Sequence, residues 1–261
     1  MKKPDLEYLD MATGERIAVL ATDPDTNQRH GPGLFWLGGF KSSMGGTKAS
    51  ALSAWARESG RACCRFDYSG NGMSDQDAFE DATITKWLAQ AQEVFEKYAP
   101  GPRIVVGSSM GGWLALLLYR ALSKRGCADQ IAGMVLIAPA ADMTTHLMWD
   151  VFPKPIRAEI ETKGVWHRPS DYGDGDYPIT LNLIEDGREH LILEGGLDVV
   201  CPVRILHGDA DPDVPWQHGE RLFQALHGDD ITFTLIKNGD HRLSSTEDIS
   251  RLIQTIATLP V

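Results

Sequence analysis

The sequence predicts an α/β fold, in which helices cover both faces of a mostly parallel sheet. Short, continuous apolar runs bounded by turn residues recur along the chain, and they alternate with segments of helical periodicity. Continuous apolar runs are typical of parallel strands that are buried on both faces, and the helices between them supply the crossover connections. A length of 261 residues fits one such domain with an insertion.

Eight strands and five core helices are expected from these patterns. The opening runs LEYLDM and RIAVLAT, separated by the turn around Gly14, predict a hairpin that adds an antiparallel edge. The other predicted strands are GLFWLGG (33–39), ACCRFDY (62–68), RIVVGSS (103–109), GMVLIAPA (133–140), VRILHGD (203–209) and ITFTLIK (231–237). The predicted helices of the core cover residues 47–59, 83–97, 111–123, 217–226 and 246–257.

The section over residues 143–199 breaks this rhythm. It contains Trp149, Trp166 and the polar run SDYGDGDYP. So long a connection in a compact domain is usually a functional insertion. We therefore expect a core made of residues 1–142 and 200–261, with a small cap or lid above the carboxyl ends of the strands, where open α/β sheets bind ligands.

Composition excludes several classes of protein. The chain is 43% hydrophobic and 23% charged, which is typical of a globular protein. With 36 acidic residues against 25 Lys and Arg, its net charge of -11 argues against binding to nucleic acid. No apolar run reaches the roughly 18 residues that a transmembrane helix needs. The segment MKKPDLEYLD lacks the apolar region of a signal peptide, so we expect a cytoplasmic location.

The four cysteines are predicted to be buried free thiols. They form no CxxC pair and no Cys/His cluster with zinc spacing, so no metal site is expected from them. Cys63 and Cys64 are adjacent in an apolar run, and strand geometry directs neighbouring side chains to opposite faces of a sheet. The four residues are Cys63, Cys64, Cys127 and Cys201.

The motif GSSMG, residues 107–111, indicates a nucleophile elbow centred on Ser109. It directly follows the apolar run RIVV and precedes an apolar helix. A sharp strand-to-helix turn lifts the serine hydroxyl above the sheet, and the flanking glycines avoid steric clashes in that turn. The helix N-terminus adds positive potential for a developing oxyanion. An alternative is a plain glycine-rich turn before a helix.

The acid partner is expected after the nucleophile, in the loop LHGDADPDVP. We select Asp211, which lies past the carboxyl end of its predicted strand. Asp209 and Asp213 compete with it, although aspartates beside Gly and Pro commonly form turns. Asp142, just past the preceding strand, is a further alternative.

The predicted base is His241, in the loop KNGDHRL after the last strand. Three other histidines lie near predicted core elements. We expect His207 to be structural, because it ends a strand, and we expect His218 and His227 to be exposed to solvent beside a helix.

Two amide groups are expected to form an oxyanion hole. One belongs to Met110, the residue after the nucleophile, and the other to Phe40, which follows Gly38 and Gly39 in the loop after the third strand.

Two other glycine-rich segments are not expected to bind a cofactor. In DYSGNGMSD, Asp75 replaces the third glycine of a dinucleotide fingerprint, so a tight turn is expected, and GGTK (45–48) lacks the residue order of a phosphate loop.

Together these motifs resemble the α/β-hydrolase family. The resemblance is carried by GSSMGG, DYSGNGMS, HGDADPDVP and DHRL. The runs KGVW, CPVRILHG and VPW extend it over about residues 33–245 toward a thioesterase branch of animal mitochondria. The lack of a targeting segment suggests a bacterial relative. Gly38 is a departure, because many hydrolases have His there and that branch has Pro. The resemblance implies a triad of Ser109, Asp211 and His241.

We therefore expect a serine hydrolase of carboxylic esters or thioesters, acting through an acyl-serine intermediate. The expected substrate is a small ester or thioester, or an acylated protein, and no metal or cofactor is required. Three tryptophans, Trp149, Trp166 and Trp216, are candidates for an apolar acyl pocket, although each could equally serve in packing. An aminopeptidase, a C–C hydrolase, a perhydrolase or a non-catalytic receptor on this fold are the alternatives.

Overall fold

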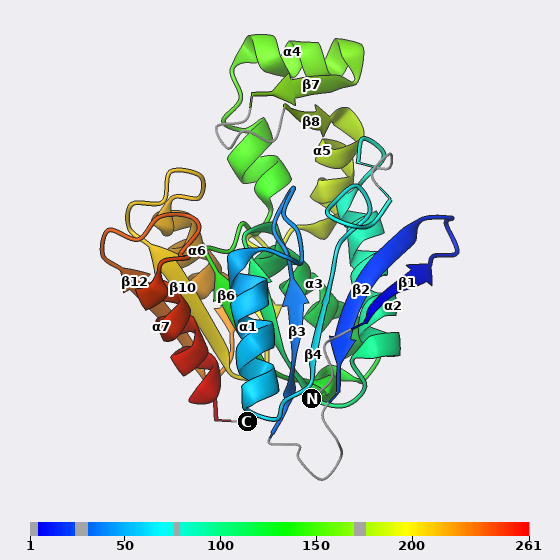
Figure 1. The fold of residues 1–261 in the computed structure, drawn as a ribbon. Helices are drawn as coiled ribbons and strands as arrows, with labels where there is room; N and C mark the ends of the chain where they lie inside the picture. The colour runs from blue at the N-terminus through cyan, green and yellow to red at the C-terminus, as the bar shows by residue number, and fades with distance from the viewer. Residues whose placement is uncertain (1–4, 24–30, 76–78, 170–175, 261) are drawn as a thin grey trace.

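The computed structural model describes residues 5–23, 31–75, 79–169 and 176–260. A central sheet is covered by helices on both faces, and the insertion stands above one end of the sheet (Figure 1). Residues 170–175 of the predicted polar run, and His30, lie outside the described residues. No helix in the described ranges is long and apolar enough to cross a membrane.

The central sheet has eight strands in the order β1-β2-β4-β3-β5-β6-β10-β12. β2 pairs antiparallel with β1 and with β4, and the other pairs are parallel. This confirms the predicted fold class and the opening hairpin. The strands are β1 (Leu6–Asp10), β2 (Arg16–Thr22), β3 (Gly33–Leu37), β4 (Cys63–Phe66), β5 (Arg103–Ser108), β6 (Ile131–Ile137), β10 (Val203–Gly208) and β12 (Ile231–Ile236).

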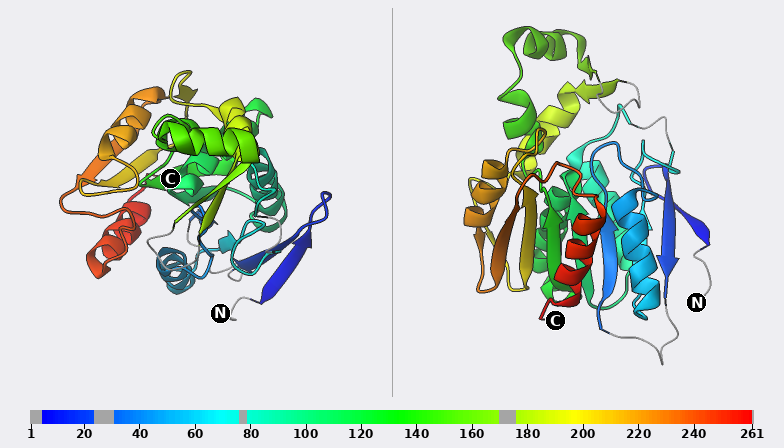
Figure 2. Two further views of the ribbon diagram at one scale, coloured as in Figure 1. Left: turned by 90° about the horizontal axis from the view of Figure 1, so that it is seen from above. Right: turned by 60° about the vertical axis from the view of Figure 1, so that its left-hand side comes forward.

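Two layers of helices bury the two faces of this sheet. α1 and α7 pack together on one face, and α2, α3 and α6 lie on the other (Figures 1 and 2). Alternate residues of β4 feed the two resulting cores, so that Cys63 lies in one and Cys64 in the other, as free thiols. The helices are α1 (Thr47–Glu58), α2 (Ile84–Tyr98), α3 (Met110–Lys124), α6 (Trp216–Ala225) and α7 (Thr246–Ala257).

The connection between Asp142 and β10 rises above the sheet, and we call its upper part (residues 143–190) the cap. It stands above the carboxyl ends of the parallel strands in Figure 1. The connection then runs down to the amino-terminal ends of the strands, where the short strand β9 (Leu197–Asp198) pairs with β11 (Leu226–His227) before β10 begins. Its other elements are the π-helical turn η3 (Thr144–Trp149), α4 (Lys154–Lys163), β7 (Val165–Arg168), β8 (Tyr177–Thr180), α5 (Leu181–Gly187) and η4 (Arg188–His190).

Asp142 joins the two ends of the cap. Its carboxylate accepts hydrogen bonds from the backbone N–H groups of Ile192, at 2.9 Å, and Leu193, at 2.8 Å, and it is fully buried. Burial raises the pKa of this carboxyl, and the bonds from Leu193 and Ile192 oppose that change. Asp142 is therefore occupied at the base of the cap.

Replacing Asp142 with Ala should destabilise the protein by roughly 3 kcal/mol, because it leaves the buried Ile192 N–H and the half-buried Leu193 N–H without acceptors. Urea unfolding at neutral pH measures this effect. The matched control is Asp150→Ala, since the Asp150 side chain is 53% exposed beside His146 and should change the free energy of unfolding by less than about 0.5 kcal/mol. Equal stabilities of the two variants would contradict a stabilising role for the hydrogen bonds that Asp142 accepts.

The structure corrects the prediction that His218 is exposed. The residue is 5% exposed, and its Nε2–H donates to the carbonyl oxygen of Ala141 at 2.7 Å, which links α6 to the base of the cap. By contrast, the His227 side chain is 61% exposed, as expected. Burial lowers the pKa of His218 to about 4, partly offset by the bond to Ala141. The sequence shows that His218 lies beside a helix, but it does not show that other residues cover this face of α6.

The buried, neutral His218 should make the fold sensitive to acid. An unfolded histidine with a pKa of about 6.5 takes up a proton before the folded one does. Stability is therefore lost as pH falls from 6.5 toward 4, by about 2 kcal/mol at pH 5. In His218→Gln, which retains an N–H donor, the loss between pH 7.5 and pH 5 should be smaller by that amount in urea unfolding. A pH dependence identical to that of the wild type would refute this assignment.

Candidate active site

Ser109 occupies the strained turn that the sequence predicts between β5 and α3. Its backbone has φ 56° and ψ -120°, and it is the N-cap of α3. Glycine is required on both sides of the turn, because any side chain would collide with the backbone. A Cβ on Gly107 would lie 2.3 Å from the Gly111 carbonyl oxygen, and one on Gly111 would lie 2.0 Å from the Leu37 carbonyl oxygen. The turn is therefore a nucleophile elbow in geometry.

His241 bridges Ser109 and Asp211. Its Nε2 lies 3.1 Å from the Ser109 Oγ, and its Nδ1 lies 2.8 Å from the Asp211 Oδ2. An ionised carboxylate can only accept, so Nδ1–H donates to Asp211 and Nε2 is left to accept the Ser109 hydroxyl proton. Residues 132 and 30 positions from His241 thus converge on one ring.

The environment of Asp211 keeps it ionised. Its side chain is fully buried, which opposes ionisation, but hydrogen bonds from His207, His241 and the Val214 backbone outweigh burial. These contacts hold the pKa of Asp211 well below its usual range. The competing aspartates have other positions: Asp209 pairs with Lys237 at 2.7 Å, and Asp213 donates its N–H to Asp211 Oδ1 at 2.9 Å.

His207 is fully buried behind the acid and plays the structural part expected of it. Its Nε2–H donates to the Val214 carbonyl oxygen at 2.9 Å, and the same nitrogen lies 3.5 Å from Asp211 Oδ2. The ring therefore braces the loop that carries Asp211.

The two predicted oxyanion donors come from segments that adjoin the nucleophile. Met110 is the first residue of α3, and Phe40 follows the close approach of Gly39, where a Cβ would lie 3.3 Å from the Ser109 Cβ. The Phe40 loop is fastened to the end of β4, because the buried Asp67 accepts the Met44 N–H at 2.5 Å. The expected turn in DYSGNGMSD is present after β4.

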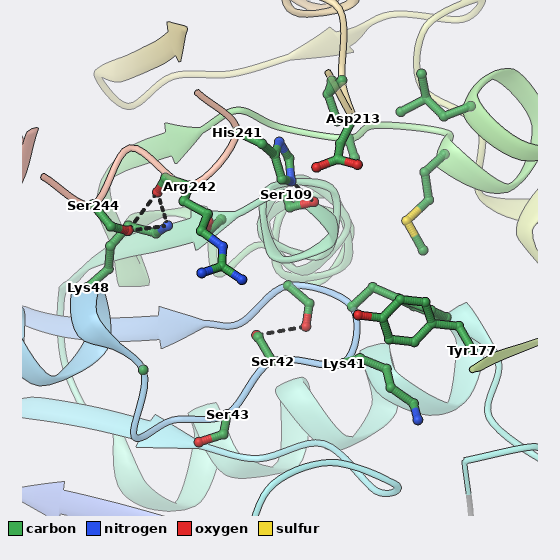
Figure 3. Close-up of a pocket in the computed structure, with 18 of the residues that line it drawn as sticks. Lys41, Ser42, Ser43, Lys48, Ser109, Tyr177, Asp213, His241, Arg242 and Ser244 are labelled. Carbon is green, nitrogen blue, oxygen red and sulfur yellow. Dashed lines mark hydrogen bonds between the residues drawn. The ribbon is translucent and has the colours of Figure 1, made fainter. Parts of the chain in front are cut away.

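A cavity of about 630 Å³ opens beside Ser109 and His241, which is an ordinary size for a small-molecule site. Figure 3 shows Tyr177 and Lys41 on one side of Ser109, and Lys48, Arg242 and Ser244 on the other. The larger apolar side chains in its described lining are Trp36, Phe40, Met143, Leu147, Met148, Tyr177, Ile179 and Val214.

The three predicted tryptophans are not among the described residues that line this cavity. Trp149 lies beneath the Arg188 guanidinium, with 5.4 Å to the ring centre. Trp166 packs edge-on against Phe152. Trp216 is the first residue of α6. Aromatic character alone could not distinguish these positions from a pocket wall.

Several residues that line the cavity are not among those predicted from the sequence. Met143, Leu147 and Met148 lie in or beside η3, and isolated apolar residues in an irregular segment carry no signal of their own. Arg242 could have been found from its place next to His241, and Lys48 from its place after the glycine pair of GGTK.

One group of residues offers atoms suited to a metal ion. Ligand atoms of Asp211, Asp213 and His241 lie within 4.8 Å of one another. Since Asp211 and His241 are already hydrogen-bonded to each other, their present orientation suits proton transfer between His241 and Ser109.

The chain belongs to the α/β-hydrolase family. The model of the Alpha/beta hydrolase family matches residues 30–251, and the fold described above agrees with it.

Relatives of this chain are hydrolases. It is 36% identical over 229 residues to the human mitochondrial palmitoyl-protein thioesterase ABHD10, covering 87% of this chain and 72% of that protein. The structure of mouse ABHD10 has a TM-score of 0.84 and 35% identity, with 97% of each chain covered. The crystal structure of a protein from Agrobacterium vitis S4, named a putative hydrolase, has a TM-score of 0.92 and 41% identity, with 98% of each chain covered. These comparisons support hydrolase activity of the esterase or thioesterase kind.

Proposed function

We propose that the chain is a serine hydrolase that cleaves carboxylic esters or thioesters through an acyl-serine intermediate. The observation that carries this proposal is the continuous hydrogen-bonded arrangement Ser109–His241–Asp211 at the edge of the cavity. The similarity to proteins named palmitoyl-protein thioesterase supports the choice of ester and thioester substrates.

Each residue has a defined role in this reaction. Ser109 attacks the acyl carbonyl while His241 takes its proton, and His241 then returns that proton to the leaving group. Asp211 orients the ring and stabilises the imidazolium. The amide N–H groups of Phe40 and Met110 stabilise the oxyanion. Water then hydrolyses the acyl-serine by the same proton transfers, which regenerates the free hydroxyl.

The apolar side of the cavity is assigned to the acyl group. Met143, Leu147, Met148 and Ile179 offer unbranched or branched aliphatic surface, which an acyl chain can bury. We assign the acyl contacts to these residues rather than to the three tryptophans. The substrate is a small ester or thioester, or the acyl group of a modified protein. The sequence predicts a cytoplasmic location, whereas the ABHD10 relatives are mitochondrial proteins.

A chain-length series tests this function. p-Nitrophenyl esters from acetate to palmitate, and thioesters of the same acids, are offered to the enzyme, which is also labelled with a fluorophosphonate probe. We expect labelling together with turnover that rises with chain length until the apolar side is filled. A protein that neither labels nor turns over would instead be a binding protein, and a clear preference for amide or peroxide substrates would indicate another triad hydrolase.

A further inference from the structure

The loop that carries His241, which we call the base loop (residues 238–244), has a strained backbone. Asn238 and Leu243 both have positive φ, of 58° and 42°. Asparagine tolerates this left-handed region, but a bulky residue such as leucine is an outlier there. Such a conformation persists only where the surrounding structure holds it in place. The contacts that hold Leu243 therefore also fix the position of His241, two residues earlier.

Leu243 is held through its side chain and through its backbone N–H. The side chain is buried in the same apolar core as Leu52 of α1 and Leu252 of α7. Its N–H donates to Asp240 Oδ1 at 2.8 Å. These contacts fix the amide end of the peptide unit between residues 242 and 243. The other end of that unit is the Arg242 carbonyl oxygen, which needs a donor of its own.

Lys48 supplies a bond at this carbonyl end. Its ammonium donates to the Arg242 carbonyl oxygen from α1, 194 residues away in the sequence, and lies 3.4 Å from Ser244 Oγ. The Ser244 hydroxyl donates to the same carbonyl oxygen at 2.9 Å. Figure 3 shows these three residues joined by dashed lines beside the cavity. The peptide unit that follows His241 is thus held at both its N–H and its C=O group.

The place of Lys48 on α1 is electrostatically unfavourable without such a partner. It is the second residue of a helix that begins at Thr47, and the start of a helix favours negative rather than positive charge. Burial lowers the pKa of Lys48 to about 8, while Asp240 and Asp248 oppose that change and the Arg242 guanidinium reinforces it. A charge-assisted bond, which is about twice as strong as a neutral one, offsets part of this cost.

A second tie joins the base loop to the loop that carries Asp211. The Gly239 carbonyl oxygen accepts the Ala210 N–H at 3.0 Å. This bond holds the base loop on the side before His241, whereas Lys48 holds it on the side after. The His241 ring therefore extends from a stretch of backbone that is fixed at two points.

We propose that Lys48 is a positioning residue for His241. By holding the peptide unit after His241, it keeps Nε2 within hydrogen-bond distance of the Ser109 hydroxyl and Nδ1 beside Asp211. This inference rests on the proposed function, because it assigns a part in that reaction to a side chain that holds the backbone of the base loop. A misplacement of a catalytic group by about 1 Å can cost about 100-fold in rate. Loss of the Lys48 bond should therefore lower kcat rather than raise KM.

Lys48→Met removes the ammonium and keeps most of the side-chain length. With a p-nitrophenyl ester that the wild type cleaves, we expect kcat to fall about 30-fold with KM within about twofold, because the base is misplaced while substrate contacts remain. The rate of labelling by a fluorophosphonate probe should fall by a similar factor. Lys48→Arg keeps a charged donor and should recover kcat to within about threefold of the wild type. The matched control is Lys124→Met, an exposed lysine at the end of α3, which should change neither constant.

The pH profile separates this role from simple packing. In the wild type, kcat should fall about fivefold between pH 7.5 and pH 9.5, because Lys48 loses its proton near pH 8 and a neutral amine forms a weaker hydrogen bond. Lys48→Arg stays charged over this range, so its kcat should stay constant up to about pH 9.5. Lys48→Met should give a low profile without this alkaline fall. An alkaline fall that Lys48→Arg retains would overturn the assignment.

Histidine NMR gives a readout that needs no turnover. In protein labelled with ¹⁵N-histidine, the ring nitrogens of His241 are assigned by their loss in His241→Gln, and their shifts report which nitrogen carries the proton. We expect one tautomer, protonated at Nδ1, in the wild type and in Lys48→Arg. In Lys48→Met we expect the two shifts to move toward each other, as in a mixture of tautomers.

The outcomes separate this inference from the proposed function. Unchanged kcat in Lys48→Met, or a loss confined to KM, overturns the positioning role while the hydrolase stands. A wild type that neither labels nor turns over removes the proposed function, and the NMR comparison then decides alone: identical His241 shifts in the wild type and Lys48→Met overturn the inference. If thermal unfolding shows that Lys48→Met is unfolded, the pH profiles of the wild type and Lys48→Arg decide instead.

Discussion

Ser109→Ala should abolish hydrolysis of every ester and thioester that the wild type cleaves, lowering kcat by a factor on the order of 10⁵. The variant removes the oxygen that lies 3.1 Å from His241 Nε2, so that no acyl-serine can form. Labelling by a fluorophosphonate probe should disappear with it. The fold should remain, because the side chain is lost from the cavity edge and the backbone of the turn is held by the Ser109 N–H bond to the Ile137 carbonyl oxygen.

Ser123→Ala is the control for this experiment, since Ser123 is exposed near the other end of α3. It should retain full activity and labelling. Substantial turnover in Ser109→Ala, with labelling retained, would place the nucleophile elsewhere in the chain.

Asp211→Asn should lower kcat by roughly 10³- to 10⁴-fold, with little change in KM. The amide would offer an N–H group to His241 Nδ1 where the carboxylate now accepts at 2.8 Å, and this favours the tautomer that cannot take the Ser109 proton. The imidazolium would also lose the negative charge that stabilises it. A loss of 10⁴-fold corresponds to about 5 kcal/mol of transition-state stabilisation.

Asp213→Asn is the matched comparison, because Asp213 borders the same cavity but is exposed and is not the carboxylate bonded to His241. Its kcat should fall less than about tenfold. Both variants should be compared by steady-state kinetics and by thermal unfolding, so that a loss of folding is not read as a loss of catalysis. If Asp213→Asn were the more damaging substitution, the acid would have to be reassigned.

Strand and helix patterns in this sequence predict the core because each element carries its own signal. Continuous apolar runs such as RIVV identify strands buried on both faces, and the predicted helix 246–257 agrees with α7 at both ends. The glycines of GSSMG are predictable for a local reason, since a Cβ at Gly107 or Gly111 would collide with the backbone. The chain order of Ser109, Asp211 and His241 limits the choice of partners without any coordinates.

Contacts between segments that are distant in the sequence cannot be predicted from these local patterns. Three aspartates in one loop have similar local sequences, and their surroundings distinguish them: Asp211 is buried against His241, whereas Asp209 pairs with Lys237. The exposure expected for His218 is wrong, because periodicity does not reveal that this residue of α6 bonds to the Ala141 carbonyl oxygen. Of the three tryptophans considered for the acyl pocket, Trp149 and Trp166 contact Arg188 and Phe152, and Trp216 is the first residue of α6.

The class of fold, the serine turn and the candidates for its partners can be predicted without coordinates, because these depend on local periodicity and backbone sterics. Tertiary structure decided which carboxylate contacts His241, which side chains line the cavity, and that Lys48 meets Arg242 across a separation of 194 residues. Burial, charge neighbours and hydrogen-bond partners are properties of the packed chain, and the packing of loops and of the cap has no periodic pattern that a sequence could display.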